Sequence, residues 1–153
     1  MTTRKKRLVL DQVDRKIAGL QQLDLQVPEK GWINTIRTAL NMSMRQLADR
    51  VKKKAQNIQA SENNEANGTI NLQSLNEIAE ALDMKVVYAI IPKQGTLHEM
   101  IVKQAYKKAT EIVERTSTSM ALEDQENSKD RLNNAKMEKV SELVNEMPKF
   151  LWD

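Results

Sequence analysis

The sequence predicts a mainly α-helical fold that contains a single short strand. Apolar residues recur every three or four positions through most of the 153 residues, which is the spacing of amphipathic helices. Only residues 85–92, "KVVYAIIP", form a run of β-branched and aromatic residues that ends at a proline. No run approaches the roughly 18 consecutive apolar residues of a membrane helix, and no long apolar stretch follows the basic start "MTTRKKR". We therefore expect a soluble, cytoplasmic protein.

The first half of the chain predicts short helices with tight breaks between them. Apolar spacing over residues 8 to about 23 indicates the first helix, which "VPEKG" ends. The segment "WINTIRTALN" indicates a second helix, with Trp32 in the core. Ser43 is expected to cap a third helix, "SMRQLADRV", after a turn at Asn41 or Met42. A fourth helix is expected to begin at "AQNIQAS".

The second half predicts one more short helix, the strand and two long helices. Residues 72–82 keep helical register after a polar turn, a long helix begins at Leu97, and a last amphipathic helix covers Leu132 to Met147. The expected regions are an N-terminal basic arm and helix (1–29), a helical domain (30–84), the strand (85–92) and a C-terminal helical region (96–153).

The lone strand needs a partner for its backbone. An unpaired strand leaves N–H and C=O groups without hydrogen bonds, and no second strand is evident in the sequence. The most economical partner is the same strand of a second copy, which predicts a homodimer with two-fold symmetry. The alternative is an extended segment buried on the chain's own helices. The residues expected in the dimer strand are Val86, Val87, Tyr88, Ala89, Ile90 and Ile91.

Charge is distributed unevenly, although the net charge is only +3. Residues 1–60 hold 13 Lys and Arg against 5 Asp and Glu, whereas residues 61–153 hold 11 against 16. A basic front half suggests a polyanion-binding module, and chance clustering on solvated faces is the alternative. The chain has no cysteine and one histidine, His98, so we expect no metal site, no cofactor and no enzymatic activity.

Two short helices with a tight turn, followed by a third, are typical of a helix-turn-helix DNA-binding domain. The helix that begins at "AQNIQAS" would lie in the major groove, where Gln56, Asn57 and Gln59 offer paired donors and acceptors to base edges. Two such helices in a dimer would lie about 34 Å apart and read an inverted-repeat operator in double-stranded DNA. The expected phosphate contacts are Arg37, Ser43, Arg45, Lys52, Lys53, Lys54 and Asn63.

Four segments carry a resemblance to a known family: "GWINTIRTALNMSMRQLADRV", "EANGTINLQSLNEIAEALDMKVVYAIIPK", "ERTSTSMALEDQ" and "LWD". Together they resemble mobile mystery protein A, a family with a Cro/repressor-type, xenobiotic-response-element-like helix-turn-helix, over residues 8–153. The resemblance implies a lambda-repressor-like domain whose base-contacting positions fall on Ala55, Gln56, Asn57, Gln59 and Ala60. Lys52 stands where the family turn has glycine, so a left-handed residue costing about 1 kcal/mol or more is expected there.

The resemblance also implies a partner, because genes of this family commonly lie beside one for a Fic-domain protein. The chain is then expected to be an autorepressor and the antitoxin of a toxin–antitoxin pair. In the alternative, it neutralises a partner mainly through its C-terminal helices, and DNA binding is secondary. Ser119 and Glu123 have the spacing of the inhibitory motif that restrains Fic proteins, although Asp124 departs from it. Phe150, Leu151 and Trp152 are expected to dock on such a partner or on the chain's own core.

Overall fold

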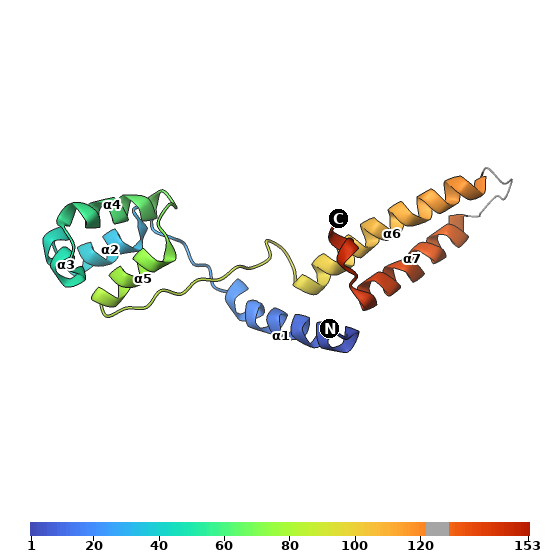
Figure 1. The fold of residues 1–153 in the computed structure, drawn as a ribbon, viewed down its shortest axis with the longest axis horizontal. Helices are drawn as coiled ribbons and strands as arrows, with labels where there is room; N and C mark the ends of the chain where they lie inside the picture. Colours follow the sequence, from blue (N-terminus) through green and yellow to red (C-terminus); the bar gives the residue numbers. More distant parts are fainter. Residues whose placement is uncertain (122–128) are drawn as a thin grey trace. The chain divides into compact units, whose positions relative to one another are not determined.

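The computed structural model describes residues 1–121 and 129–153, and Figure 1 shows the fold. The chain divides into two compact units. We call residues Asp24–Ala89 the inserted unit, and Met1–Leu23 together with Ile90–Asp153 the terminal unit. The described residues form α-helices and one short 3-10 helix, which confirms the mainly helical class. Of the N-terminal region expected as a separate part, residues 1–23 belong to the same unit as the C-terminal helices and residues 24–29 to the inserted unit.

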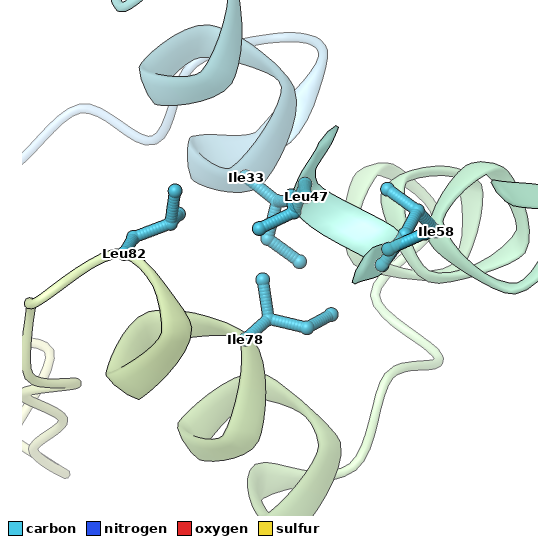
Figure 2. Close-up of a cluster of buried hydrophobic side chains, with 6 residues drawn as sticks. Ile33, Leu47, Ile58, Ile78 and Leu82 are labelled. Carbon is cyan, nitrogen blue, oxygen red and sulfur yellow. The ribbon is translucent and has the colours of Figure 1, made fainter. Parts of the chain in front are cut away.

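The inserted unit packs four short helices around one apolar core. Figure 2 shows Ile33, Leu47, Ile58 and Ile78, one side chain from each helix, pointing toward one another, with Leu82 beside them. Leu47 and Ile58 have no exposed surface at all. The spacing of these residues in the sequence therefore places one stripe of each helix in a shared core. The helices are α2 (Gly31–Ala39), α3 (Met44–Val51), α4 (Ala55–Ala66) and α5 (Leu72–Ala81).

Helix α3 begins and ends as the sequence predicts. The Ser43 hydroxyl accepts a hydrogen bond from the Gln46 backbone N–H, and the Gln46 side chain accepts one from the Ser43 N–H, so both free donors are satisfied. At the other end, Lys52 has φ 57° and ψ 42°, the left-handed conformation expected from the missing glycine. The Lys53 N–H then donates to the Ala48 C=O at 2.9 Å and closes the helix.

The N-terminus of α2 is capped by a side chain from α4. The Glu65 carboxylate accepts from the backbone N–H groups of Trp32 and Ile33, both at 2.8 Å. Gly31 precedes them with φ +79°, and a Cβ there would lie 2.8 Å from the Glu65 carboxylate. Trp32 itself is 43% exposed and lines an apolar groove of about 390 Å³ within the inserted unit. The prediction that Trp32 lies in the core is therefore wrong, because the first turn of α2 faces this groove.

The terminal unit is a helical hairpin with two smaller elements on it. Helices α6 and α7 pack against each other (Figure 1), and their buried faces meet Leu151 of the short helix η1. The core side chains are Ile101, Ala105, Ala109, Val140, Leu143 and Leu151. The elements are α1 (Thr3–Gln21), α6 (Leu97–Ala121), α7 (Lys129–Glu146) and η1 (Lys149–Trp152).

Helix α1 is attached to this hairpin mainly through the ends of the other helices. The Asp14 carboxylate accepts from the first two backbone N–H groups of α6, at 2.8 and 3.1 Å. The Lys6 ammonium donates to the Glu146 C=O at the end of α7, at 2.9 Å. Each charge opposes the partial charge of the helix end that it contacts. None of the residues of α1 is buried, so these polar contacts hold much of the helix in place.

Residues 85–91 form no strand in the single chain, where no described backbone group pairs with theirs. Val87, Tyr88 and Ile90 are 72, 70 and 89% exposed. The alternative of a segment buried on the chain's own helices is therefore wrong for these three side chains. Pairing across a dimer stays a prediction.

None of the helices within residues 1–121 and 129–153 is long and apolar enough to cross a membrane.

Candidate nucleic-acid interface

Helix α4 presents on its outer surface the residues that were predicted to contact bases. Ile58 is fully buried, so it fixes which face of the helix points inward. Gln56, Gln59 and Asn63 follow at positions three and four residues apart and therefore share one face. All of them are exposed, as are the small residues that flank them. The predicted DNA-contacting residues of α4, all of them exposed, are Ala55, Gln56, Asn57, Gln59, Ala60 and Asn63.

The two carboxylates of α4 both point away from this face. Glu62 is 5% exposed and lies inside the unit, one helical turn after Ile58. Glu65 caps α2, as described above. The outer face of the helix therefore carries amide and methyl groups and no negative charge. Amide side chains can donate and accept hydrogen bonds at the same time, which is what the adenine edge requires.

Glu62 forms a buried ion pair with Arg37 of α2. The Arg37 Nε atom lies 2.6 Å from Glu62 Oε1, and Arg37 Nη2 and Asn34 Nδ2 donate to Oε2 at 3.2 and 2.8 Å. Arg37 Nη1 also donates to the Met42 C=O at 2.8 Å. The Arg37 side chain is only 11% exposed. Its predicted phosphate contact is therefore wrong, because the guanidinium is turned inward and is used to hold α2 against α4.

The ion pair changes the acidity of both groups. Burial on its own raises the pKa of Glu62, but the hydrogen bonds from Arg37 and Asn34 and the charge of Arg37 outweigh it, so the pKa lies below its ordinary value. The hydrogen bond to Glu62 raises the pKa of Arg37. Glu62 was missed in the sequence, although a charged residue four positions after Ile58 on the inward face is the signal that would have found it.

Basic residues surround the start of α4. Lys52 and Lys54 are exposed and form no ion pair with any described residue, and Arg45 is exposed on the first turn of α3. Ser43 is exposed as well, although its hydroxyl is used in capping. Lys52 and Lys54 lie in the connection between α3 and α4, whereas Ser43 and Arg45 lie at the N-terminal end of α3.

Lys53 differs from its two neighbours. Its ammonium lies 2.6 Å from Oε2 of Glu77 on α5, and the two side chains are 40 and 42% exposed. The hydrogen bond from Lys53 lowers the pKa of Glu77, so this carboxylate is ionised at neutral pH. The Lys53 side chain is therefore exposed, but its ammonium is already paired with a carboxylate.

At the C-terminal end, one of the three predicted partner-contacting residues is buried in the chain itself. Leu151 has no exposed surface, and its C=O accepts a hydrogen bond from Gln104 Nε2 at 2.7 Å. Leu151 thus docks on the core of the terminal unit and is not available to a partner. Phe150 and Trp152, on either side of it, are 47 and 58% exposed. The pattern formed by Ser119, Glu123 and Asp124 lies outside the side chains that the structure describes.

Comparisons with protein-family models, with curated proteins and with solved structures find no match to this chain. The surface of the inserted unit is therefore the main guide to function. It combines a carboxylate-free face of α4 with lysines at the start of that helix. Such a surface suits an anionic ligand that presents flat hydrogen-bonding edges between its charges.

Proposed function

We propose that the protein is a sequence-specific, double-stranded DNA-binding transcriptional regulator. In this proposal the inserted unit is a lambda-repressor-like helix-turn-helix domain, α3 and α4 are the two helices of the motif, and α4 enters the major groove. The observation that carries the proposal is the outer face of α4, which holds amides while Glu62 and Glu65 are both used inside the unit. A carboxylate on that face would repel the phosphates that line the groove.

The side chains divide into two groups by the part of DNA that they suit. Gln56, Asn57 and Gln59 would pair with base edges, and the small residues Ala55 and Ala60 would allow close approach and contact with thymine methyl groups. Because Ile58 is locked in the core, α4 would enter the groove as a rigid element. The proposed phosphate contacts are Ser43, Arg45, Lys52, Lys53, Lys54 and Asn63.

We further propose that the active form is a homodimer joined through residues Val86–Ile91, so that two copies of α4 face two half-sites. Exposed apolar side chains and an unpaired backbone in this segment support the pairing. Ile90→Asp tests it, because Ile90 is 89% exposed in the single chain and its replacement leaves the monomer fold intact. We expect sedimentation to show a shift from dimer to monomer; a dimer of unchanged strength would contradict the pairing.

DNA binding is tested by fluorescence anisotropy on the protein's own upstream region, with a scrambled duplex as competitor and across a salt series. Gln56→Ala and Asn57→Ala should each cost about 1–3 kcal/mol at the operator and relax base preference. Asn76→Ala, an exposed amide on α5, is the matched control and should change neither. Operator preference that survives both α4 variants would refute the groove assignment. Equal, salt-sensitive binding to both duplexes would leave only a basic surface.

The resemblance of the sequence to mobile mystery protein A supports a role in a toxin–antitoxin pair. We propose that the chain represses its own operon and acts as the antitoxin of a Fic-domain partner. Regulation is tested by a reporter joined to the upstream region, whose expression should rise when Gln56 and Asn57 are both replaced by alanine.

A second candidate is a protein-binding antitoxin for which DNA is secondary. The exposure of Phe150 and Trp152 beside buried Leu151 favours a partner surface at this end of the chain. Phe150→Ser with Trp152→Ser keeps Leu151, and so the core of the terminal unit, in place. Loss of Fic-partner capture with full operator binding would establish the surface; full capture by this double variant would refute it.

A further inference from the structure

On the basis of the proposed function, we propose that Glu77 on α5 is an internal competitor of DNA for Lys53. In the free protein a Glu77 carboxylate oxygen occupies the place beside the Lys53 ammonium that a phosphate oxygen would take. DNA must break this pair before Lys53 can contact the backbone. Glu77 thereby limits the affinity of the interface, although it touches neither bases nor phosphates.

The geometry of Lys53 separates it from the lysines on either side. Its backbone N–H is fixed by the hydrogen bond to the Ala48 C=O, and its ammonium reaches across to α5, where it meets Glu77 at 2.6 Å. Lys52 and Lys54 project into solvent and pair with no described carboxylate. One of the three consecutive lysines is therefore already engaged with an anion.

The ion pair between Lys53 and Glu77 affects how many cations DNA releases when the protein binds. A lysine that binds a phosphate releases about one condensed cation from DNA, and this release makes the logarithm of affinity fall with a slope of about 0.9 per contact in the logarithm of salt concentration. While Lys53 stays paired with Glu77, it neutralises no phosphate and releases no condensed cation from DNA. As long as the carboxylate keeps this lysine, Lys53 adds little to affinity or to salt dependence in the wild-type chain.

Glu77→Gln should reverse this effect. We expect the full-length variant to bind the operator more tightly, with a salt slope steeper by about 0.9 than that of the wild type. Between 200 and 50 mM salt, the ratio of variant to wild-type affinity should therefore grow about 3.5-fold. Glu80→Gln is the matched control, because it removes the same charge from the exposed surface of α5 without freeing a lysine. Its salt slope should equal that of the wild type.

A double-mutant cycle with Lys53→Gln shows whether the effect passes through this lysine. Glu77→Gln should leave the salt slope unchanged when Lys53 is already absent. An unchanged slope in Glu77→Gln alone, weaker binding by that variant, or an effect that persists without Lys53 would each overturn the inference while operator binding by the wild type stands. A wild-type chain that shows no operator preference would overturn the proposed function itself, and this inference with it.

Discussion

Replacing Arg37 by methionine tests the buried ion pair that joins α2 to α4. Methionine keeps the apolar stem of the side chain and removes the charge. The Glu62 carboxylate, 5% exposed, would keep only the hydrogen bond from Asn34 Nδ2, and the Met42 C=O would lose its donor. Removing one partner of a buried pair leaves an uncompensated charge and typically costs about 3–5 kcal/mol. We expect a loss of that size in the free energy of unfolding at pH 7.

The loss of stability should depend on pH, and the titration of Glu62 determines whether it grows or shrinks as pH falls. In the wild type the pKa of Glu62 is held below 4.5, so its contribution to stability is complete above that unfolded value and is lost as pH falls through the lowered folded pKa. In Arg37→Met, burial acts on the Glu62 carboxyl without the cation and favours its neutral form. Protonation then relieves the penalty. The difference in stability between variant and wild type should therefore start to narrow above pH 4.5, as pH falls through the raised folded pKa of the variant. It should narrow further below pH 4.5, where the wild type loses its own contribution.

Urea unfolding followed by tryptophan fluorescence can measure this in the inserted unit alone. The chain has two tryptophans, and Trp152→Phe leaves Trp32 as the only reporter. The double variant Arg37→Met with Glu62→Met should recover most of the lost stability, because a buried pair replaced by apolar side chains is often neutral. A loss under about 1 kcal/mol at pH 7, or an equal loss at pH 7 and pH 4, would refute the role given to the pair.

Two further substitutions test the packing of each unit. Gly31→Ala should lower the free energy of unfolding by about 2–3 kcal/mol, because it combines a left-handed residue with displacement of the Glu65 cap. The control Gly68→Ala has φ +72° but no atom within 4 Å of the added Cβ, so it should cost only about 1 kcal/mol. Equal costs in urea unfolding would argue against the cap. Leu151→Ala should destabilise the terminal unit by about 2–5 kcal/mol, and the exposed-site control Phe150→Ala by under about 1 kcal/mol. Unfolding of this unit can be followed by Trp152 fluorescence in a chain with Trp32 replaced by phenylalanine. A small effect of Leu151→Ala would contradict its place in the core.

Features that depend on neighbouring residues could be predicted from the sequence. Ser43 caps α3 through a residue three positions later. The left-handed conformation of Lys52 follows instead from the family resemblance, in which glycine stands at this turn. The apolar spacing likewise places Leu47, Ile78 and Leu143 on the buried stripes of their helices, whereas in α2 it misplaces Trp32. Where the spacing was replaced by charge, the prediction failed: the basic run at the start of α1 is helical from Thr3, five residues before the first predicted position.

Features that depend on distant residues could not be read in this way. Arg37 looked like a surface cation, and only its meeting with Glu62, 25 residues later, turns it inward. Leu151 is buried because η1 packs on α6, and Lys53 is paired because α5 brings Glu77 to it. For the predicted strand, the proposed neighbour is a second copy of the chain. Contacts with DNA and with a protein partner stay predictions for the same reason, since they depend on molecules outside the chain.

The discontinuity of the terminal unit fixes an order of events during synthesis. Helix α1 leaves the ribosome early, but the helix end that its Asp14 caps begins 83 residues later. At a synthesis rate of roughly 5–20 residues per second, about 4–17 seconds pass between the synthesis of Asp14 and that of this helix end. The inserted unit is continuous in sequence, so nothing in its connectivity delays it. The nascent protein is therefore expected to complete the proposed DNA-reading unit while the helices that enclose it in the sequence are still apart.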